Sequence, residues 1–261
     1  KYLNLTGLVA NMKSVQKLLS CSFSIEKMSL SGLKLNKKIL NLIIKNENLT
    51  VLYLSTCSEL TKESIDKLTK CDKLTELNLS YIKDLSRSPD RVDIVNHLAR
   101  NLPLNLEKLC LRGIDCLSDD HVKILVNRCK KLTELDLFGS FDVTNIAYII
   151  EKLPALVKLD VSFTNVGMDS INSIAVKSLS NLKILNCLHL DLENLKSQLP
   201  NISISTERSN DLNIAIPSAL IKEKDGFWDI KAKQIDLFSW NSAGTENEFS
   251  WQEKLREHTM S

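Results

Sequence analysis

The chain has 261 residues, of which 43% are hydrophobic and 25% charged, and its formal net charge at pH 7 is +2. These proportions are typical of a globular protein, and so small a positive excess argues against a nucleic-acid-binding surface. No run of about 18 apolar residues occurs, so the sequence predicts no membrane-spanning segment. The seven cysteines include no C-x-x-C pair, which favours a reduced, intracellular protein.

A pattern of the form L-x-x-L-x-L, in which x is any residue, recurs along the chain. We read copies at residues 25, 49, 74, 106, 132, 156 and 182, and Leu3-x-Leu5 resembles the end of an earlier copy. The successive steps are 24, 25, 32, 26, 24 and 26 residues, and all but the third fall within the leucine-rich-repeat period. We place the extra residues of the long step in the polar, proline-containing segment Ser86–Asp90.

The spacing within each copy predicts a short strand. The last two apolar residues of the pattern alternate with other residues, so both should point to one face of that strand. A segment of about ten residues with apolar positions at helical spacing then follows. Because strand and helix recur in the same order, the strands should run parallel. The sequence therefore predicts an α/β leucine-rich-repeat solenoid, a right-handed horseshoe with about eight parallel strands inside and helices outside.

Two of the expected helices illustrate the pattern. Residues 36–44 place Ile39, Leu42 and Ile43 on one helical face. Residues 118–126 place Val122, Leu125 and Val126 on one face, and Ser118 is the expected N-cap.

The cysteines fit the repeat. Cys71 and Cys129 each stand three residues before a pattern leucine, and Cys57 stands three residues after Leu54. We expect buried structural thiols here, because small buried thiols are common in repeat cores and the spacing matches no zinc site.

The sequence offers no catalytic motif. His97, His121, His189 and His258 are isolated, and neither a nucleophile elbow, a P-loop nor a dinucleotide-binding glycine pattern occurs. We therefore expect no enzymatic activity, no cofactor and no metal site.

The strand residues that point away from the core should form a continuous concave surface. Its charges are mixed, which suits cross-strand pairing that keeps the sheet soluble, but equally suits a protein-docking face. Bulky residues at the strand ends, Tyr81, Phe138, Phe141 and Phe163, are candidate anchors. The residues that we select as candidate protein-binding residues are Tyr53, Tyr81, Lys108, Arg112, Asp136, Phe138, Lys158, Asp160 and Phe163.

The repeat pattern ends after Pro200. Residues 201–205 alternate like a last edge strand, and Trp228 and Ile230 later alternate with polar residues, as in an extended segment. We divide the chain into a repeat domain at 1–202, a tail at 203–238 and a flexible extension at 239–261. We expect the tail to fold back on the concave face with Trp228 and Ile230 as anchors, although it could instead cap the last repeat.

Three motifs in this region carry a family resemblance. Leu199-Pro200-Asn201-Ile202, Ala215-x-Pro217 and Trp228-x-Ile230-Lys231 match, in order and spacing, the tail of the S-phase kinase-associated F-box proteins. The chain resembles this family over roughly residues 20–238. The resemblance implies a substrate-recognition module of a cullin-RING (SCF) ubiquitin ligase, acting in ubiquitin-dependent degradation during the cell cycle, in the nucleus and cytoplasm.

The resemblance also implies partners. These are a phosphorylated protein substrate, a small cyclin-dependent-kinase regulatory subunit, and the ligase adaptor, which would bind through an F-box that these residues do not contain. Because Lys1 falls within a repeat, we expect the chain to be part of a longer protein. No nucleic-acid or membrane partner is expected.

Three residues depart from the family. Tyr81 stands where a tryptophan is expected, Asp115 where a basic residue is expected, and Gly139 where an acidic residue is expected. These differences predict an altered partner pocket. The alternative function is a leucine-rich-repeat scaffold or inhibitor unconnected to ubiquitin, and an F-box upstream of Lys1 would decide between the two.

Overall fold

The computed structural model describes residues 1–6, 12–21, 24–86, 88–170, 178–184, 187 and 189–206, and the backbone of 221–224 and 227–230. The chain divides into two compact units, Lys1–Arg208 and Ser209–Ser261, and each is described by itself.

The first unit contains one sheet of nine parallel strands whose spatial order is their order in the chain. The strands, three residues each, are β1 (Tyr2–Asn4), β2 (Lys27–Ser29), β3 (Val51–Tyr53), β4 (Glu76–Asn78), β5 (Lys108–Cys110), β6 (Glu134–Asp136), β7 (Lys158–Asp160), β8 (Asn181–Lys183) and β9 (Ser203–Ser205).

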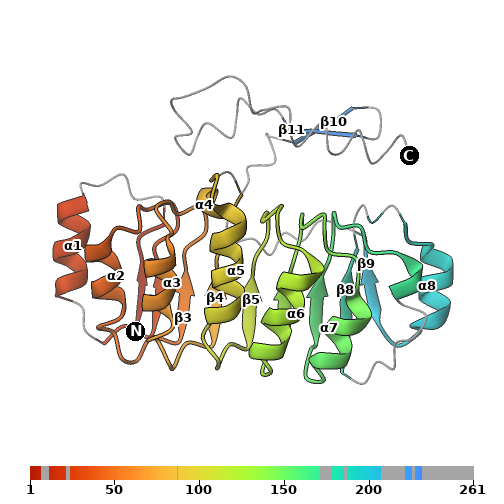
Figure 1. The fold of residues 1–261 in the computed structure, drawn as a ribbon, viewed down its shortest axis with the longest axis horizontal. Helices are drawn as coiled ribbons and strands as arrows, with labels where there is room; N and C mark the ends of the chain where they lie inside the picture. Colours follow the sequence, from red (N-terminus) through yellow and green to blue (C-terminus); the bar gives the residue numbers. More distant parts are fainter. Residues whose placement is uncertain are drawn as a thin grey trace. The chain divides into compact units, whose positions relative to one another are not determined.

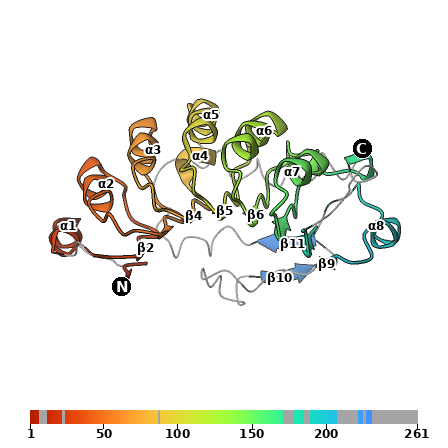
Figure 2. The ribbon, with the colours of Figure 1, turned by 90° about the horizontal axis from the view of Figure 1, so that it is seen from below.

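Helices connect successive strands and lie on one side of the sheet (Figures 1 and 2). They are α1 (Met12–Ser20), α2 (Lys37–Ile43), α3 (Lys62–Leu68), α4 (Lys83–Ser86), α5 (Arg91–Asn101), α6 (Asp119–Arg128), α7 (Ile146–Lys152) and α8 (Leu192–Gln198), with a 3-10 turn, η1, at Met168–Ser170. The predicted leucine-rich-repeat solenoid is therefore confirmed. It has nine described strands in this sheet, because the expected edge strand, β9, adds to the eight that contain motif residues.

The core is built as a ladder of repeat leucines. The middle leucines of the motif stand in register across the central strands, with Leu52 opposite Leu77, Leu77 opposite Leu109, and Leu109 opposite Leu135. Each of these four side chains is at most 2% exposed. Since every leucine packs between the equivalent residues of its neighbours, no repeat closes its core alone.

The register of the last motif differs from the prediction. Strand β8 places Leu182 opposite Leu159, so Leu182 is the second apolar residue of its motif and not the first. The motif is Leu179-x-x-Leu182-x-Ile184, and all three side chains are buried. Leu182, Leu185 and Cys187 also have the spacing of the motif, three residues later along the chain. Only the register that starts at Leu179 gives this leucine the place that Leu156 has in the preceding repeat.

Local sequence explains the helix starts. The Asn36 side chain caps α2 by accepting hydrogen bonds from the backbone N–H groups of Lys38 and Ile39, each at 3.1 Å. The helix buries Ile39, Leu40 and Ile43, and Leu42 is half-buried and packs against the same core.

Helix α6 follows the prediction. Ser118 is its N-cap, and Val122, Leu125 and Val126 are buried. The long step between the repeats of β4 and β5 holds two helices, α4 and α5. Only part of the predicted insertion, Ser86–Asp90, lies between them, because Ser86 ends α4.

The thiols occupy equivalent core positions. The Cys57 thiol donates to the carbonyl oxygen of Leu30 at 3.2 Å, and the Cys187 thiol donates to that of Val161 at 3.0 Å. Each hydrogen bond therefore joins the turn that contains the cysteine to the last motif residue of the preceding repeat. Burial raises the pKa of Cys57 to about 12, and the pKa values of Cys71 and Cys129 to about 11.

We expect Cys57 and Cys129 to react with iodoacetamide more than about tenfold more slowly than Cys21 in the folded chain, because buried thiols ionise poorly. Cys21 is exposed and serves as the internal control, whereas Cys57 and Cys129 are 0% exposed. Time-resolved labelling mapped by mass spectrometry measures the ratio. Equal rates at the three cysteines would contradict the assigned burial.

The second unit contains a hairpin of β10 (Ile221–Lys224) and β11 (Phe227–Ile230), paired antiparallel with Glu223 opposite Trp228. The expected anchors, Trp228 and Ile230, lie on β11. Their docking against the concave face stays a prediction, and the extension at 239–261 lies outside the described residues.

Candidate protein-binding site

The turns after the strands share one unusual backbone position, which we call the rim. It is the seventh residue after the start of the six motifs that begin at residues 25 to 156, and φ there lies between 55° and 85°. The rim residues are Gly32, Thr56, Tyr81, Gly113, Gly139 and Phe163. Glycine adopts this left-handed conformation freely, but for other residues it costs about 1–3 kcal/mol.

Backbone hydrogen bonds hold the rim in this conformation. The N–H of Tyr81 donates to the carbonyl oxygen of Arg112 at 2.8 Å, and that of Gly113 donates to Phe138 at 2.8 Å. The same bond joins Gly139 to Ser162 at 2.9 Å. These bonds hold the backbone of Tyr81 in its positive φ and so fix the direction of its ring, and Phe163 adopts the same backbone conformation at its rim position.

An ion network joins three adjacent strands just before the rim. Arg112 donates through Nε and Nη2 to Oδ2 of Asp136, at 2.9 and 2.7 Å, and through Nη2 to Oδ2 of Asp160 at 2.8 Å. The side chain of Arg112 is 7% exposed, that of Asp160 11% and that of Asp136 23%. The other oxygens of the two carboxylates accept from backbone N–H groups two residues later, at Phe138 and Ser162.

The electrostatics of this network are unbalanced. Burial raises the pKa of Asp136, the neighbouring Asp160 raises it further, and Arg112 opposes both. The net direction is upward, so a single guanidinium does not offset the burial of Asp136 beside a second carboxylate.

Aromatic rings cover the network. The guanidinium of Arg112 lies 4.5 Å from the centre of the Phe138 ring, a cation–π distance. The Phe138 and Phe163 rings are 4.8 Å apart, centre to centre, and tilted by 46°. Both phenylalanines are half-buried, so each leaves part of its surface to solvent. We call the six residues Tyr81, Arg112, Asp136, Phe138, Asp160 and Phe163 the rim cluster.

Tyr81 joins the cluster from the side of β4. A Cβ atom added at Gly113 would lie 2.5 Å from Cδ1 of Tyr81, so the tyrosine ring rests on the glycine backbone. Burial raises the pKa of Tyr81 to about 12, while nearby Arg112 acts in the opposite direction. Sequence reasoning missed Gly113, although aligning the repeats at their seventh residue would have found it.

Replacing Gly113 with alanine should lower the free energy of unfolding by about 1–3 kcal/mol, because φ is +76° and the added methyl group meets Tyr81. The matched control is Gly167→Ala, where the nearest atom to the added methyl group is Cβ of His189 at 3.8 Å. That control should stay within about 0.5 kcal/mol of the wild type. Urea unfolding of both variants tests the difference, and equal losses would exclude a special role for Gly113.

The structure does not bring the remaining candidate residues into this cluster. Tyr53 lies on β3 and donates its hydroxyl to Oε1 of Glu76 at 2.7 Å. Lys108 and Lys158 flank Glu134, with N–O distances of 2.8 and 3.4 Å. These pairs are the cross-strand charge pairing that the mixed signs had suggested.

Phe141, another expected anchor, is only 7% exposed, so little of its side chain is available to a partner. Asp115, one of the family departures, is half-buried.

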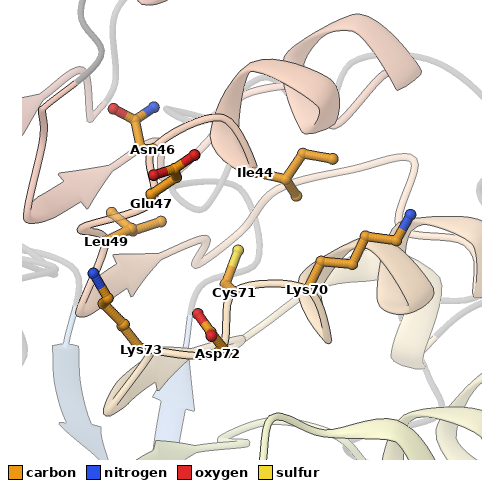
Figure 3. A pocket seen from close by; sticks show the side chains of 8 residues that line it. All are labelled: Ile44, Asn46, Glu47, Leu49, Lys70, Cys71, Asp72 and Lys73. Carbon is orange, nitrogen blue, oxygen red and sulfur yellow. The ribbon is translucent and has the colours of Figure 1, made fainter.

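A pocket of about 220 Å³ lies away from the rim cluster, between the repeats of β3 and β4 (Figure 3). Its lining mixes charged and apolar side chains: Ile44, Asn46, Glu47, Leu49, Lys70, Cys71, Asp72 and Lys73. Cys71 is buried, and burial raises its pKa, so the pocket offers no activated thiol.

Within the described ranges, no three His, Cys, Asp or Glu side chains are grouped to hold a metal ion. In the same part of the chain, no helix is both long and apolar enough to cross a bilayer.

Comparison with known proteins gives a family match. The model of the SKP2 LRR domain, where LRR denotes leucine-rich repeat, matches residues 1–235 and so extends past the repeats into the tail. Among solved structures, the chain is similar to a chain of the Rad7–Elc1 complex from yeast, with 17% identity and a TM-score of 0.49. That similarity covers 77% of this chain but only 60% of the yeast chain. Internalin C2 of Listeria monocytogenes is similar at 20% identity and a TM-score of 0.44, with 72% of each chain covered.

Proposed function

Because the chain belongs to the SKP2 leucine-rich-repeat domain family, we propose that it is the substrate-recognition module of an SCF-type ubiquitin ligase. In this role the concave face and rim bind a target protein, and an F-box outside residues 1–261 binds the ligase adaptor. The chain itself performs no chemistry. It raises the local concentration of the target near the enzyme that transfers ubiquitin.

The observation that supports the binding site most strongly is the rim cluster. Half-buried aromatic residues around a largely desolvated ion network have the composition of binding hot spots, in which Tyr, Trp and Arg are enriched. Tyr81 and Phe163 also keep a backbone conformation that disfavours bulky residues, and such strain concentrates at functional sites.

Other parts of the proposal rest on the family alone. A phosphorylated target, a small cyclin-dependent-kinase regulatory subunit, a role in the cell cycle, and residence in the nucleus and cytoplasm all follow from the resemblance. The departures at Tyr81, Asp115 and Gly139 lie at or next to the rim, where they would change which partner is bound.

The test compares the half-lives of bound proteins. Proteins captured by the chain are identified, and their decay after a block of translation is followed in cells with the gene intact, deleted or carrying Phe163→Lys. Deletion and Phe163→Lys should both lengthen the half-lives, and proteasome inhibition should remove the difference. Val92→Lys is the control, because Val92 is a 48% exposed residue on α5 and should behave as wild type.

The alternative role makes the opposite prediction. For a scaffold or inhibitor unconnected to ubiquitin, captured proteins would decay at the same rate with or without the gene. That result would exclude the ligase role while leaving protein binding intact.

A further inference from the structure

The charges of the rim cluster indicate what kind of partner side chain it accepts. Arg112 is the cation that the structure places within ion-pair distance of Asp136 and Asp160, at 2.7 and 2.8 Å. These three side chains together carry one formal negative charge in excess. Asp136 is the more exposed of the two carboxylates, at 23% against 11% for Asp160, so it is the one that a partner's cation can reach.

Arg112 is poorly placed to receive an anion from a partner. Its side chain is 7% exposed, and its Nε and Nη2 already donate to the two aspartates. A phosphate or carboxylate at this point would also meet two carboxylates, and like charges at close range repel. An uncharged apolar side chain would fit no better, since it would remove the remaining solvent from Asp136 without supplying a counter-charge.

The aromatic surface favours a cation. Phe138 holds the Arg112 guanidinium at 4.5 Å and packs against Phe163 at 4.8 Å, and both rings leave part of their surface to solvent. Aromatic faces attract lysine and arginine side chains, and more strongly where water is partly excluded. Asp136, the most exposed of the three charged side chains, supplies the counter-charge beside them.

We propose that the rim cluster binds a lysine or arginine side chain of a partner protein segment, packed against Phe138 and Phe163 with Asp136 as its counter-ion. This inference rests on the proposed function in one respect, that the partner segment belongs to a ligase target. The binding preference itself concerns the purified chain and is tested without any ligase.

The experiment uses the purified 261-residue chain and nine-residue peptide libraries that are random except at the central position. That position is fixed as arginine, lysine, glutamate, phosphoserine or phenylalanine. We expect the arginine and lysine libraries to bind about tenfold more tightly than the others, which corresponds to about 1.4 kcal/mol. Phe163→Leu should reduce this preference, because it removes an aromatic face and keeps an apolar side chain.

Matched charge variants locate the effect. Asp136→Asn removes the proposed counter-ion while its amide oxygen can still accept from Arg112, so the preference should fall to about twofold or less. Glu134→Gln makes the same charge change two residues earlier on β6, where Glu134 pairs with Lys108 and Lys158, and should keep the preference. Circular dichroism confirms that each variant is folded.

Several results would overturn the inference. These are tighter binding of the glutamate, phosphoserine or phenylalanine library, binding of none of the libraries, or equal effects of Asp136→Asn and Glu134→Gln. Each leaves the degradation test of the proposed function standing, because that test measures half-lives of captured proteins and not side-chain preference.

Discussion

Replacing Arg112 with methionine is expected to lower the free energy of unfolding by about 3–5 kcal/mol, because it leaves the buried Asp160 and the half-buried Asp136 without their cation. Oδ2 of Asp136 accepts two of the hydrogen bonds from Arg112, and Oδ2 of Asp160 accepts one. Methionine preserves most of the side-chain volume, so the loss reports charge more than packing. Urea unfolding at pH 7, followed by circular dichroism, measures it.

The loss should depend on pH in a defined direction. The pKa of Asp136 in the folded chain is already raised by burial and by Asp160, while Arg112 and the backbone N–H of Phe138 oppose the shift. Removing Arg112 raises this pKa further. A group with a raised folded pKa contributes stability at low pH and loses it as pH rises through that pKa. The free energy of unfolding of the variant should therefore be close to that of the wild type below about pH 4, and the difference should grow as the pH rises to neutral.

A combined variant provides the control. Changing Asp136 and Asp160 to leucine together with Arg112→Met replaces the whole network by apolar side chains, which should restore most of the lost stability. A loss below about 1 kcal/mol for Arg112→Met, independent of pH, would mean that the network behaves as an exposed ion pair.

Replacing Leu109 with alanine should lower the free energy of unfolding by about 2–5 kcal/mol, through lost burial and the cavity that remains. Leu109 is 2% exposed and stands in register between Leu77 and Leu135, so the cavity opens toward both adjacent repeats. Urea unfolding measures the change.

Lys108→Ala is the control on the same strand. Lys108 is half-buried and faces away from the core in a surface ion pair with Glu134, so its loss should cost at most about 1 kcal/mol. Equal losses for the two variants would contradict the leucine ladder as the source of stability.

The sequence predicted the repeat architecture well because its period is local and recurs. Seven spaced copies constrained strand direction, helix position and core residues together. The sequence did not predict the register of the last copy, because the motif could start at Leu179 or at Leu182. Only the pairing of Leu182 with Leu159 in the structure decides between the two. Helix α4 was not predicted, because the 32-residue step between the fourth and fifth strands occurs once and offers no second copy for comparison.

The candidate site was predicted in part. Arg112, Asp136 and Asp160 were selected one by one as residues facing away from the core, but their network depends on the reach of one guanidinium across two strands. Tyr81 and Phe163 were selected as aromatic residues, whereas their shared left-handed backbone appears only in the structure. Phe141 looked equivalent to them, but its side chain is buried.

The most direct test of the account is photo-crosslinking from the rim. A photoreactive phenylalanine analogue at position 163 should crosslink, in cells, to proteins that accumulate when the gene is deleted. The same analogue at position 92, on the exposed face of α5, should not. Crosslinks to such proteins from position 92 but not from position 163 would contradict the rim as the site at which this chain binds its targets.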